Sequence, residues 1–156
     1  MRAAIRSFII ASLILCLSAC HFQSVRHSPV KAAVGANQFL KSLYFDEDYS
    51  GALRLADKRL RQSTTASDLK KMVDGTKQEL GALKTLRADS YLMTQGETME
   101  LFYTGEYEKG VLHHRLVLQG DASTGYRVSG VWFQVNAYQE NRLRRRFDDE
   151  ILVGQP

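Results

Sequence analysis

The sequence predicts an α+β domain in which N-terminal helices pack against an antiparallel sheet. The first observation is a change of period, because apolar residues recur every three or four positions before Gly81 and every second position after it. The second is a set of short polar or Gly-containing turns between the alternating runs. The third is length, since 156 residues suit one domain with a sizeable core.

The N-terminus has the pattern of an export signal. A basic start is followed by an apolar run over residues 8–17 and by the small residues Ser18 and Ala19. The run is too short to cross a bilayer comfortably as a permanent helix, and small residues suit a peptidase cleft. We therefore predict that residues 1–19 are a signal peptide that is removed, which leaves a mature chain of 137 residues.

Charge and cysteine content exclude several classes of protein. The net charge of +4 falls to about +2 when the two arginines of the signal are removed, and the other charges are mixed along the chain. A nucleic-acid partner is therefore not expected. Cys16 and Cys20 are the two cysteines, and Cys16 leaves with the signal, so the mature chain has no intramolecular disulfide.

Two helices are predicted after a short linker. Residues 20–30 show no sustained period and contain Ser, His and Pro, which is typical of a tether. Apolar residues spaced by three and four then predict a helix over residues 31–44. Asp48 can cap a second helix over residues 49–61, and the two helices should form a hairpin.

A third helix is predicted between Thr65 and Gly81. Thr65 is followed three residues later by Asp68, which gives a capping box with Asp in place of the usual Glu. Gly81 can adopt the left-handed conformation that ends a helix. The periodic apolar positions between them are Leu69, Met72, Val73 and Leu80.

Strands are predicted in the second half of the chain, over residues 86–93, 98–107, 111–119 and 126–135. Short turns join the last three, so an antiparallel meander is the simplest arrangement. Because side chains alternate along a strand, neighbouring residues in these segments should lie on opposite faces of the sheet.

The last predicted strand is apolar on both faces. Val128 and Trp132 fall on one face, and Val131, Phe133 and Val135 fall on the other. If the Trp132 face packs under the helices, the other face needs a cover. A homodimer or an envelope protein partner would supply it through the sheet face, and the chain's own tail is the alternative.

Residues 139–156 are expected to form a charged C-terminal tail. Arginines are followed by acidic residues and then by Ile151 and Leu152. Neighbouring blocks of opposite sign are typical of a solvated segment. The alternative is a contact with membrane phosphates or with a partner, made by Arg142, Arg144, Arg145 and Arg146.

The mature sequence contains none of the common catalytic motifs. It has no Cys nucleophile, no Gly-x-Ser-x-Gly elbow, no Gly-rich phosphate loop and no His-Glu-x-x-His helix. His113 and His114 are neighbours in a predicted strand, so they point to opposite faces and cannot jointly bind one metal without a bulge. We therefore expect no catalytic residue, no metal site and no cofactor.

Four residues are candidates for binding a ligand in the interior. Tyr91, Tyr103, His114 and Trp132 bring polar groups or a large ring into an otherwise apolar region. The alternative is that the aromatic residues build the core. His114, which shares a face with leucines, would then be a hydrogen-bonded core histidine.

The residues Leu17, Ser18, Ala19 and Cys20 resemble the lipobox of bacterial lipoproteins. This resemblance implies that Cys20 is lipidated, becomes the new N-terminus and anchors the protein to a membrane of the cell envelope. It also implies an outer-membrane location facing the periplasm, because the next residue, His21, is not the aspartate associated with inner-membrane retention.

The order of elements resembles the cystatin-like, nuclear-transport-factor-2-like domains, in which helices close over a curved sheet to form a cone. Asp48 and Tyr49 followed by Ala52, residues 80–84 and residues 125–131 resemble small exported bacterial domains of unknown function with this fold. The resemblance covers residues 31–138. Its motifs are structural, and they carry no catalytic residue.

Enzymes of this fold, such as ketosteroid isomerases and dehydratases, place a Tyr with acids or a His with Asp in the cone. Asp89, His114 and the tyrosines supply these residue types, but no motif of such enzymes is matched. The resemblance therefore implies a non-catalytic binding module for a small apolar ligand or an envelope protein partner. The alternatives are an assembly or scaffolding lipoprotein and a cone-pocket enzyme.

Overall fold

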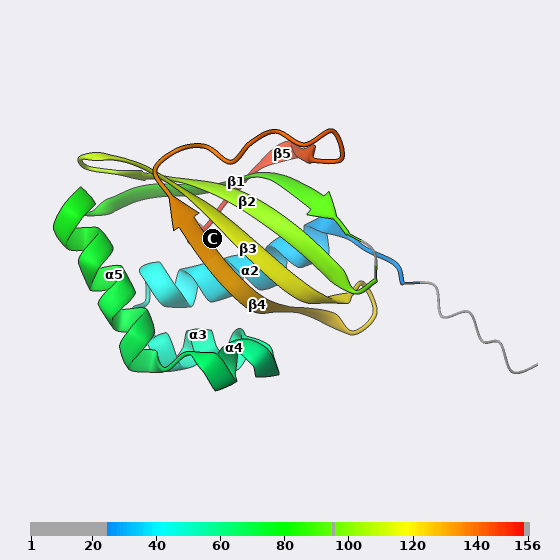
Figure 1. Cartoon of the computed structure of the whole chain (residues 1–156), viewed down its shortest axis with the longest axis horizontal. Coiled ribbons are helices and arrows are strands. Elements are labelled where there is room, and N and C mark those ends of the chain that lie inside the picture. Colours follow the sequence, from blue (N-terminus) through cyan, green and yellow to red (C-terminus); the bar gives the residue numbers. More distant parts are fainter. Residues whose placement is uncertain (1–24, 95, 155–156) are drawn as a thin grey trace, which may run out of the picture.

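The computed structural model describes residues 25–94 and 96–154 and confirms the α+β fold (Figure 1). The predicted signal peptide and Cys20 lie outside the described residues. The helices are α2 (Pro29–Tyr44), α3 (Tyr49–Leu55), α4 (Lys58–Ser63) and α5 (Ala66–Leu80). The strands are β1 (Leu83–Met93), β2 (Thr98–Tyr107), β3 (Gly110–Asp121), β4 (Gly125–Gln134) and β5 (Arg145–Leu152).

Polar side chains fix where the helices begin. Ser28 caps α2, which has Pro29 in its first turn, and Asp48 caps α3. The predicted capping box of α5 is confirmed, because Thr65 and Asp68 each bond to the other's backbone N–H. The helix ends at Gly81, whose φ of 81° favours glycine.

The second predicted helix, over residues 49–61, is wrong as a single element. The chain is extended at Ala56, which forms an isolated parallel bridge with Val128 of β4. The Asp57 N–H donates to the Val128 carbonyl at 2.9 Å, and the Asp57 side chain accepts from the Leu60 N–H at 2.8 Å. This contact with the sheet divides the segment into α3 and α4.

The strands form one antiparallel sheet in the order β4-β3-β2-β1-β5. Helix α2 packs across one face, which we call the inner face, and α3 packs against α2 (Figure 1). We call the opposite face the outer face. The meander of β1 to β4 matches the four predicted strands, although β1 begins three residues earlier.

The core fills the space between the helices and the inner face. Leucines of β2 and β3, such as Leu101 and Leu116, meet Phe39 and Leu40 of α2 in one continuous cluster. Helix α2 approaches β4 closely at Gly35, where a Cβ would lie 2.9 Å from the Tyr126 carbonyl oxygen. Glycine permits this contact because it has no side chain.

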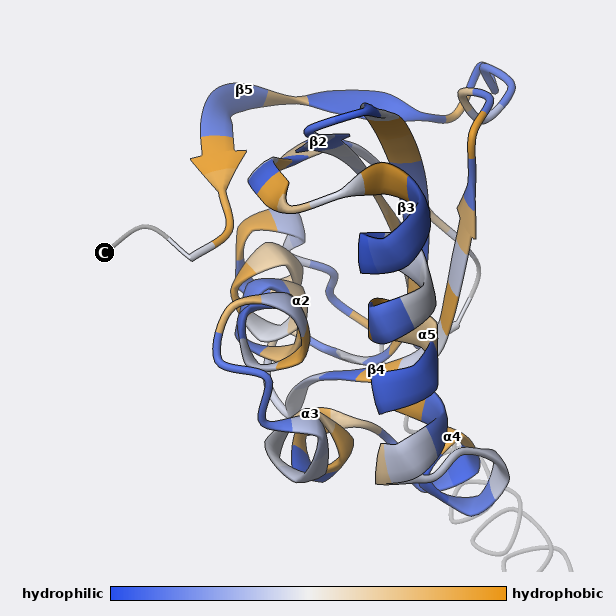
Figure 2. Cartoon of the chain, turned by 90° about the vertical axis from the view of Figure 1, so that its left-hand side faces the viewer, coloured by the Kyte–Doolittle hydropathy of each residue, from blue (hydrophilic) through white to orange (hydrophobic). Residues whose placement is uncertain are grey.

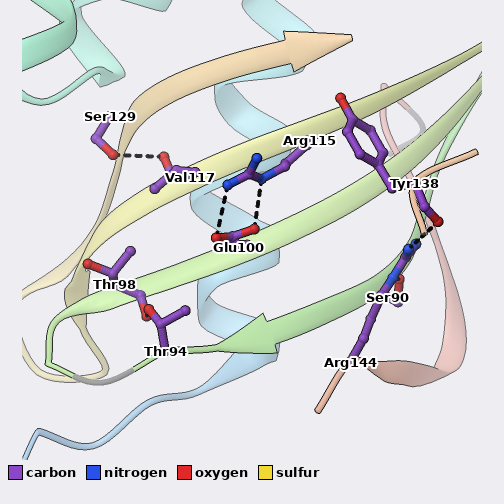
Figure 3. A network of polar contacts seen from close by, with 9 residues as sticks. All are labelled: Ser90, Thr94, Thr98, Glu100, Arg115, Val117, Ser129, Tyr138 and Arg144. Carbon is purple, nitrogen blue, oxygen red and sulfur yellow. Dashed lines mark hydrogen bonds and ion pairs between the residues drawn. The ribbon is translucent and has the colours of Figure 1, made fainter. Parts of the chain in front are cut away.

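The predicted faces of the last strand are wrong beyond Ser129. Leu118 pairs with Val128 and Val117 pairs with Gly130, so Ser129 is an extra residue in a β-bulge. Its hydroxyl donates to the Val117 carbonyl at 3.1 Å (Figure 3). The bulge shifts the alternation by one residue, which puts Trp132 on the outer face.

The same shift moves the apolar residues that were expected on the exposed face. Val131 pairs with Leu116 and Phe133 pairs with His114, so both lie on the inner side of the sheet. Val131 packs against the core. The apolar outer face predicted from Val131 and Phe133 therefore does not exist in this fold.

The charged C-terminal segment contains a strand and is not only a solvated tail. Residues 135–144, which we call the return segment, cross the outer face from β4 to the far edge of the sheet (Figure 1). There β5 pairs with β1 and begins hydrophilic but ends hydrophobic (Figure 2). Val153 is buried, and its N–H donates to the Leu86 carbonyl at 2.9 Å.

Part of the predicted tether also belongs to the folded unit. The Ala122 N–H donates to the Arg26 carbonyl at 2.8 Å, and His27 Nε2 lies 2.8 Å from the Gly96 carbonyl. Helix α2 then begins at Pro29. None of the helices in the described part of the chain is long and apolar enough to cross a membrane.

Candidate functional site

Three of the candidate ligand residues lie on the inner side of the sheet, and side chains fill the space around the two at its centre, Tyr103 and His114. The Tyr103 hydroxyl donates to Asn37 Oδ1 at 2.8 Å, and His114 Nε2 lies 3.0 Å from the Tyr44 hydroxyl. Both rings are fully buried within the core. They are paired with each other across β2 and β3, so they contact helix residues rather than an open cone.

Burial also sets the charge of these groups. It raises the pKa of Tyr103 and lowers the pKa of His114 to about 4, because the charged form of each would lose its hydration. Burial and the neighbouring Tyr107 raise the pKa of Tyr44. Tyr44, Tyr103 and His114 are therefore neutral near pH 7, which suits a hydrogen-bonded core histidine.

The other two candidates lie apart from this buried pair, Tyr91 at the inner-face edge beside β5 and Trp132 on the opposite face. Tyr91 packs against Phe147 of β5, with ring centroids 5.1 Å apart. Trp132 lies on the outer face, where the Arg115 guanidinium is 5.2 Å from its ring centroid. The structure therefore does not bring Tyr91, Tyr103, His114 and Trp132 into one cavity.

On the outer face, Arg144 of the return segment makes hydrogen bonds and an aromatic contact that hold this segment against the sheet. Its Nε donates to the Ser90 hydroxyl at 2.5 Å, and its guanidinium also donates to the Tyr138 carbonyl at 3.3 Å (Figure 3). The guanidinium carbon lies 3.9 Å from the centroid of the Phe102 ring. The Tyr138 ring meets the same Phe102 ring edge-on at 5.5 Å. We call these four residues the clasp.

The clasp places an arginine in a partly buried position. Burial lowers the pKa of Arg144, while the carboxylates of Asp89 and Glu140 act in the opposite direction. Phe102 is almost fully covered although it lies on the outer face. The return segment therefore shields an apolar ring that would otherwise lie on a polar surface.

Beside the clasp, the side chains of Glu100, Arg115 and Trp132 form a row across β2, β3 and β4. Arg115 donates two hydrogen bonds to Glu100, at 2.7 and 3.1 Å, in a bidentate pair (Figure 3). Trp132 covers Gly130, where a Cβ would collide with the indole ring. The row thus joins an ion pair to an aromatic ring on the outer face.

Two grooves open on the outer face, one on each side of the clasp. The larger has a volume of about 800 Å³ and lies over β1 and β2, bounded by the return segment and β5. The smaller has a volume of about 540 Å³ and lies over Glu100 and Arg115. Carboxylates lining the larger groove include Asp89, Glu140, Asp148, Asp149 and Glu150.

The floor of the larger groove carries a hydrogen-bonded row of three side chains. The Thr104 hydroxyl donates to Asp89, and His113 Nδ1 lies 3.1 Å from the same hydroxyl. Because the hydroxyl proton is directed at Asp89, His113 Nδ1–H must be the donor in the second bond. In this arrangement the histidine does not act as a base toward Thr104.

Among residues 25–94 and 96–154, no group of three or more His, Cys, Asp or Glu side chains has metal-binding geometry.

Local sequence patterns do not predict the clasp. One signal for it was present, because alternation places Phe102 on the same face as Glu100 and Thr104. The signal is weak, because single apolar side chains are common on protein surfaces. What covers Phe102 depends on the path of a segment some 40 residues later, which local patterns do not give.

Comparison with known proteins does not assign the chain to a family. No protein-family model, no curated protein and no solved structure matches it. Its function has to be inferred from the chain's own residues.

Proposed function

We propose that the protein is a lipid-anchored lipoprotein of the bacterial cell envelope, and that its α+β domain binds a protein partner without catalysis. The pattern ending at Cys20 supports the anchor, and the order of helices and strands supports the resemblance to nuclear-transport-factor-2-like domains. The outer face of the sheet, between the return segment and β5, is the proposed binding surface.

One observation carries this proposal: the inner face is filled and the grooves lie on the outer face. A small apolar ligand is normally held in a concave and mostly apolar pocket. The larger groove is instead lined by carboxylates, arginines, hydroxyls and amides. Such a surface favours a polar segment of another protein over a small apolar molecule.

The geometry gives less support to a cone-pocket enzyme. Such an enzyme would need an ionisable pair deep in a pocket. His114 is buried against Tyr44 in the core, and Asp89 lies on the opposite side of the sheet in an open groove. A filled interior is also what we expect of an assembly or scaffolding subunit, which is the second candidate function.

The anchor is tested by Cys20→Ser. We expect the variant to leave the membrane fraction and to lose incorporation of labelled fatty acid, because stable anchoring requires the acyl chains at this position. Cys16→Ser is the matched control, since Cys16 lies within the proposed signal and should leave with it. Unchanged membrane retention of Cys20→Ser would contradict lipid attachment.

The sorting inference has its own test. His21→Asp should move the anchored protein from the outer to the inner membrane, and His21→Asn should leave it in place. Membrane fractions separated by density would show the difference. An unchanged distribution of His21→Asp would remove the support for an outer-membrane location while leaving the anchor intact.

The binding surface is tested by photo-crosslinking in intact cells. A photoreactive residue at Asn141, on the rim of the larger groove, should give a discrete adduct. The same residue at Gln78, exposed on α5, should give none. Asp148→Lys should abolish the Asn141 adduct, because it reverses a charge of the groove. Equal adducts at both positions would contradict the proposed surface.

A further inference from the structure

The two edges of the sheet differ in how they are protected. At one edge, β5 is short and charged, and a register shift interrupts its pairing with β1. Charges along a short strand discourage pairing with a further strand. At the other edge, Ala56 and Asp57 cover β4 only at Val128. Strand β4 has its own bulge at Ser129, but residues 130–134 beyond it pair with β3 in regular register.

Beyond Val128, the edge of β4 is open. Within the described residues, positions 129–134 make no backbone hydrogen bond outside the ladder with β3. Large apolar side chains are exposed here, because Trp132 is 49% exposed, Phe133 41% and the following Val135 71%. We call residues 129–135 the free edge. Open backbone groups beside exposed apolar side chains are the usual features of a strand-pairing site.

The composition of the free edge indicates what would pair with it. Residues 128–135 read Val-Ser-Gly-Val-Trp-Phe-Gln-Val and contain no charge and no proline. An antiparallel pair of two such segments meets no like-charge repulsion, and its β-branched and aromatic residues favour a strand. A charged strand from another protein would find no opposite charge along this edge.

We propose that two copies of the chain associate through their free edges, so that β4 of one copy pairs antiparallel with β4 of the other. The contact is isologous, since the same segment is used on both sides of a two-fold axis. It continues the five-stranded sheet of each copy across the pair. The pairing does not depend on the outer-face grooves, so it goes beyond the function proposed above.

Disulfide crosslinking in membranes provides the test. The mature chain has no cysteine other than Cys20, which would be lipidated, so single cysteines can be introduced on the full-length chain at positions 130 to 135. After mild oxidation, we expect a disulfide-linked dimer that is strongest at one position and weaker on both sides. Only the residue at the two-fold axis faces its own copy.

The control is Val34→Cys, since Val34 is 54% exposed and belongs to α2, not to β4. Crosslinking at the free edge that does not exceed this control, or that is uniform across the scan, would overturn the proposal. A dimer of the unmodified chain would instead show that Cys20 keeps a free thiol. That result would contradict lipid attachment at Cys20 but not the edge pairing. The cysteine scan would then be repeated in the Cys20→Ser variant.

A charge substitution gives an independent measurement. Val135→Lys should lower the mass of the detergent-solubilised protein from dimer to monomer in light scattering, because a lysine would face apolar groups of the second copy. Val34→Lys should not change the mass. Val135 is exposed, so the substitution does not disturb the core. A dimer that persists in Val135→Lys would also overturn the proposal.

Discussion

The two faces of the sheet are built from the same strands but are closed in different ways. On β2, Leu101 and Tyr103 point to the inner face and are covered by helices, whereas Glu100 and Phe102 point to the outer face. The return segment covers Phe102 through a few polar and aromatic contacts. The inner face is therefore closed by extensive apolar burial, whereas the cover of the outer face depends on a few individual contacts.

The largest loss of stability is expected for a substitution at Leu101, which is fully buried on the inner face. Leu101→Ala should lower the free energy of unfolding by about 3–5 kcal/mol, through lost apolar burial and the cavity left behind. Leu143→Ala, in the return segment where the side chain is 70% exposed, should change it by less than about 0.5 kcal/mol. Urea unfolding measures both, and equal losses would contradict the division between the faces.

His114 should make the inner face sensitive to acid. Burial lowers its pKa in the folded state to about 4 from the ordinary value of 6.5, so the unfolded chain binds the proton more tightly. The stabilisation is complete above pH 6.5 and is lost as the pH falls toward 4. The loss reaches roughly 3 kcal/mol, at 1.36 kcal/mol for each pKa unit.

The variant His114→Gln should be less stable at pH 7 but should lack this part of the pH dependence. Leu101→Ala is the matched control, because it lowers stability by a similar amount without removing the titrating group. Its pH profile should run parallel to that of the wild type. A His114→Gln profile that also runs parallel would show that His114 is not the group responsible.

Alanine substitutions at two glycines should have smaller effects on stability, which can be compared as a pair. A Cβ at Gly35 would meet the backbone carbonyl of Tyr126, which cannot move aside, whereas a Cβ at Gly130 would meet the exposed indole of Trp132. Gly35→Ala should therefore lower the free energy of unfolding by about 1–2 kcal/mol, because overpacking outweighs the better helix propensity of alanine. Gly130→Ala should lower the free energy of unfolding by less. The fluorescence emission of Trp132 should change in this variant, because the ring has to move.

Gly75→Ala is the control for helix propensity. Gly75 lies inside α5 with open space around its Cβ position. The substitution should stabilise the protein by up to about 1 kcal/mol. Thermal unfolding would show the opposite signs of Gly35→Ala and Gly75→Ala. Equal effects would mean that α2 does not depend on its close approach to β4.

The sequence predicted those parts of the fold that local patterns determine. The capping box at Thr65, the stop at Gly81 and the alternation of β2 depend on neighbours within a few residues. The single helix predicted over residues 49–61 was wrong, because Ala56 and Asp57 bond to Val128, more than seventy residues away. Periodicity alone does not contain that contact.

The candidate site was harder to predict for the same reason. Trp132 was assigned to the wrong face because one extra residue, Ser129, reverses the alternation that follows it. The role of Arg144 depends on β5 reaching the edge of β1, which a charged segment does not suggest. His114 could be anticipated, since its leucine neighbours on the same face indicate burial.

The smallest expected effect on global stability concerns the clasp on the outer face. Arg144→Lys keeps the positive charge but loses the planar group that stacks on Phe102 and bonds to Ser90. An exposed or half-exposed cation–π contact contributes about 0.5–1 kcal/mol. Urea unfolding should therefore show only a small loss for Arg144→Lys, and none for Arg142→Lys, whose side chain is exposed.

Hydrogen exchange then distinguishes local from global opening. If the outer face opens independently, exchange of the Leu143 and residue-144 amides, which donate to Asn141, should rise several-fold in Arg144→Lys, because about 1.4 kcal/mol corresponds to a tenfold change in an equilibrium. The amides of β2 and β3 should keep their protection apart from the small global loss. Equal increases in both regions would mean that the return segment unfolds only together with the core. The outer face would then be a permanent part of the fold, and a partner would have to bind the grooves as they are, without displacing the clasp.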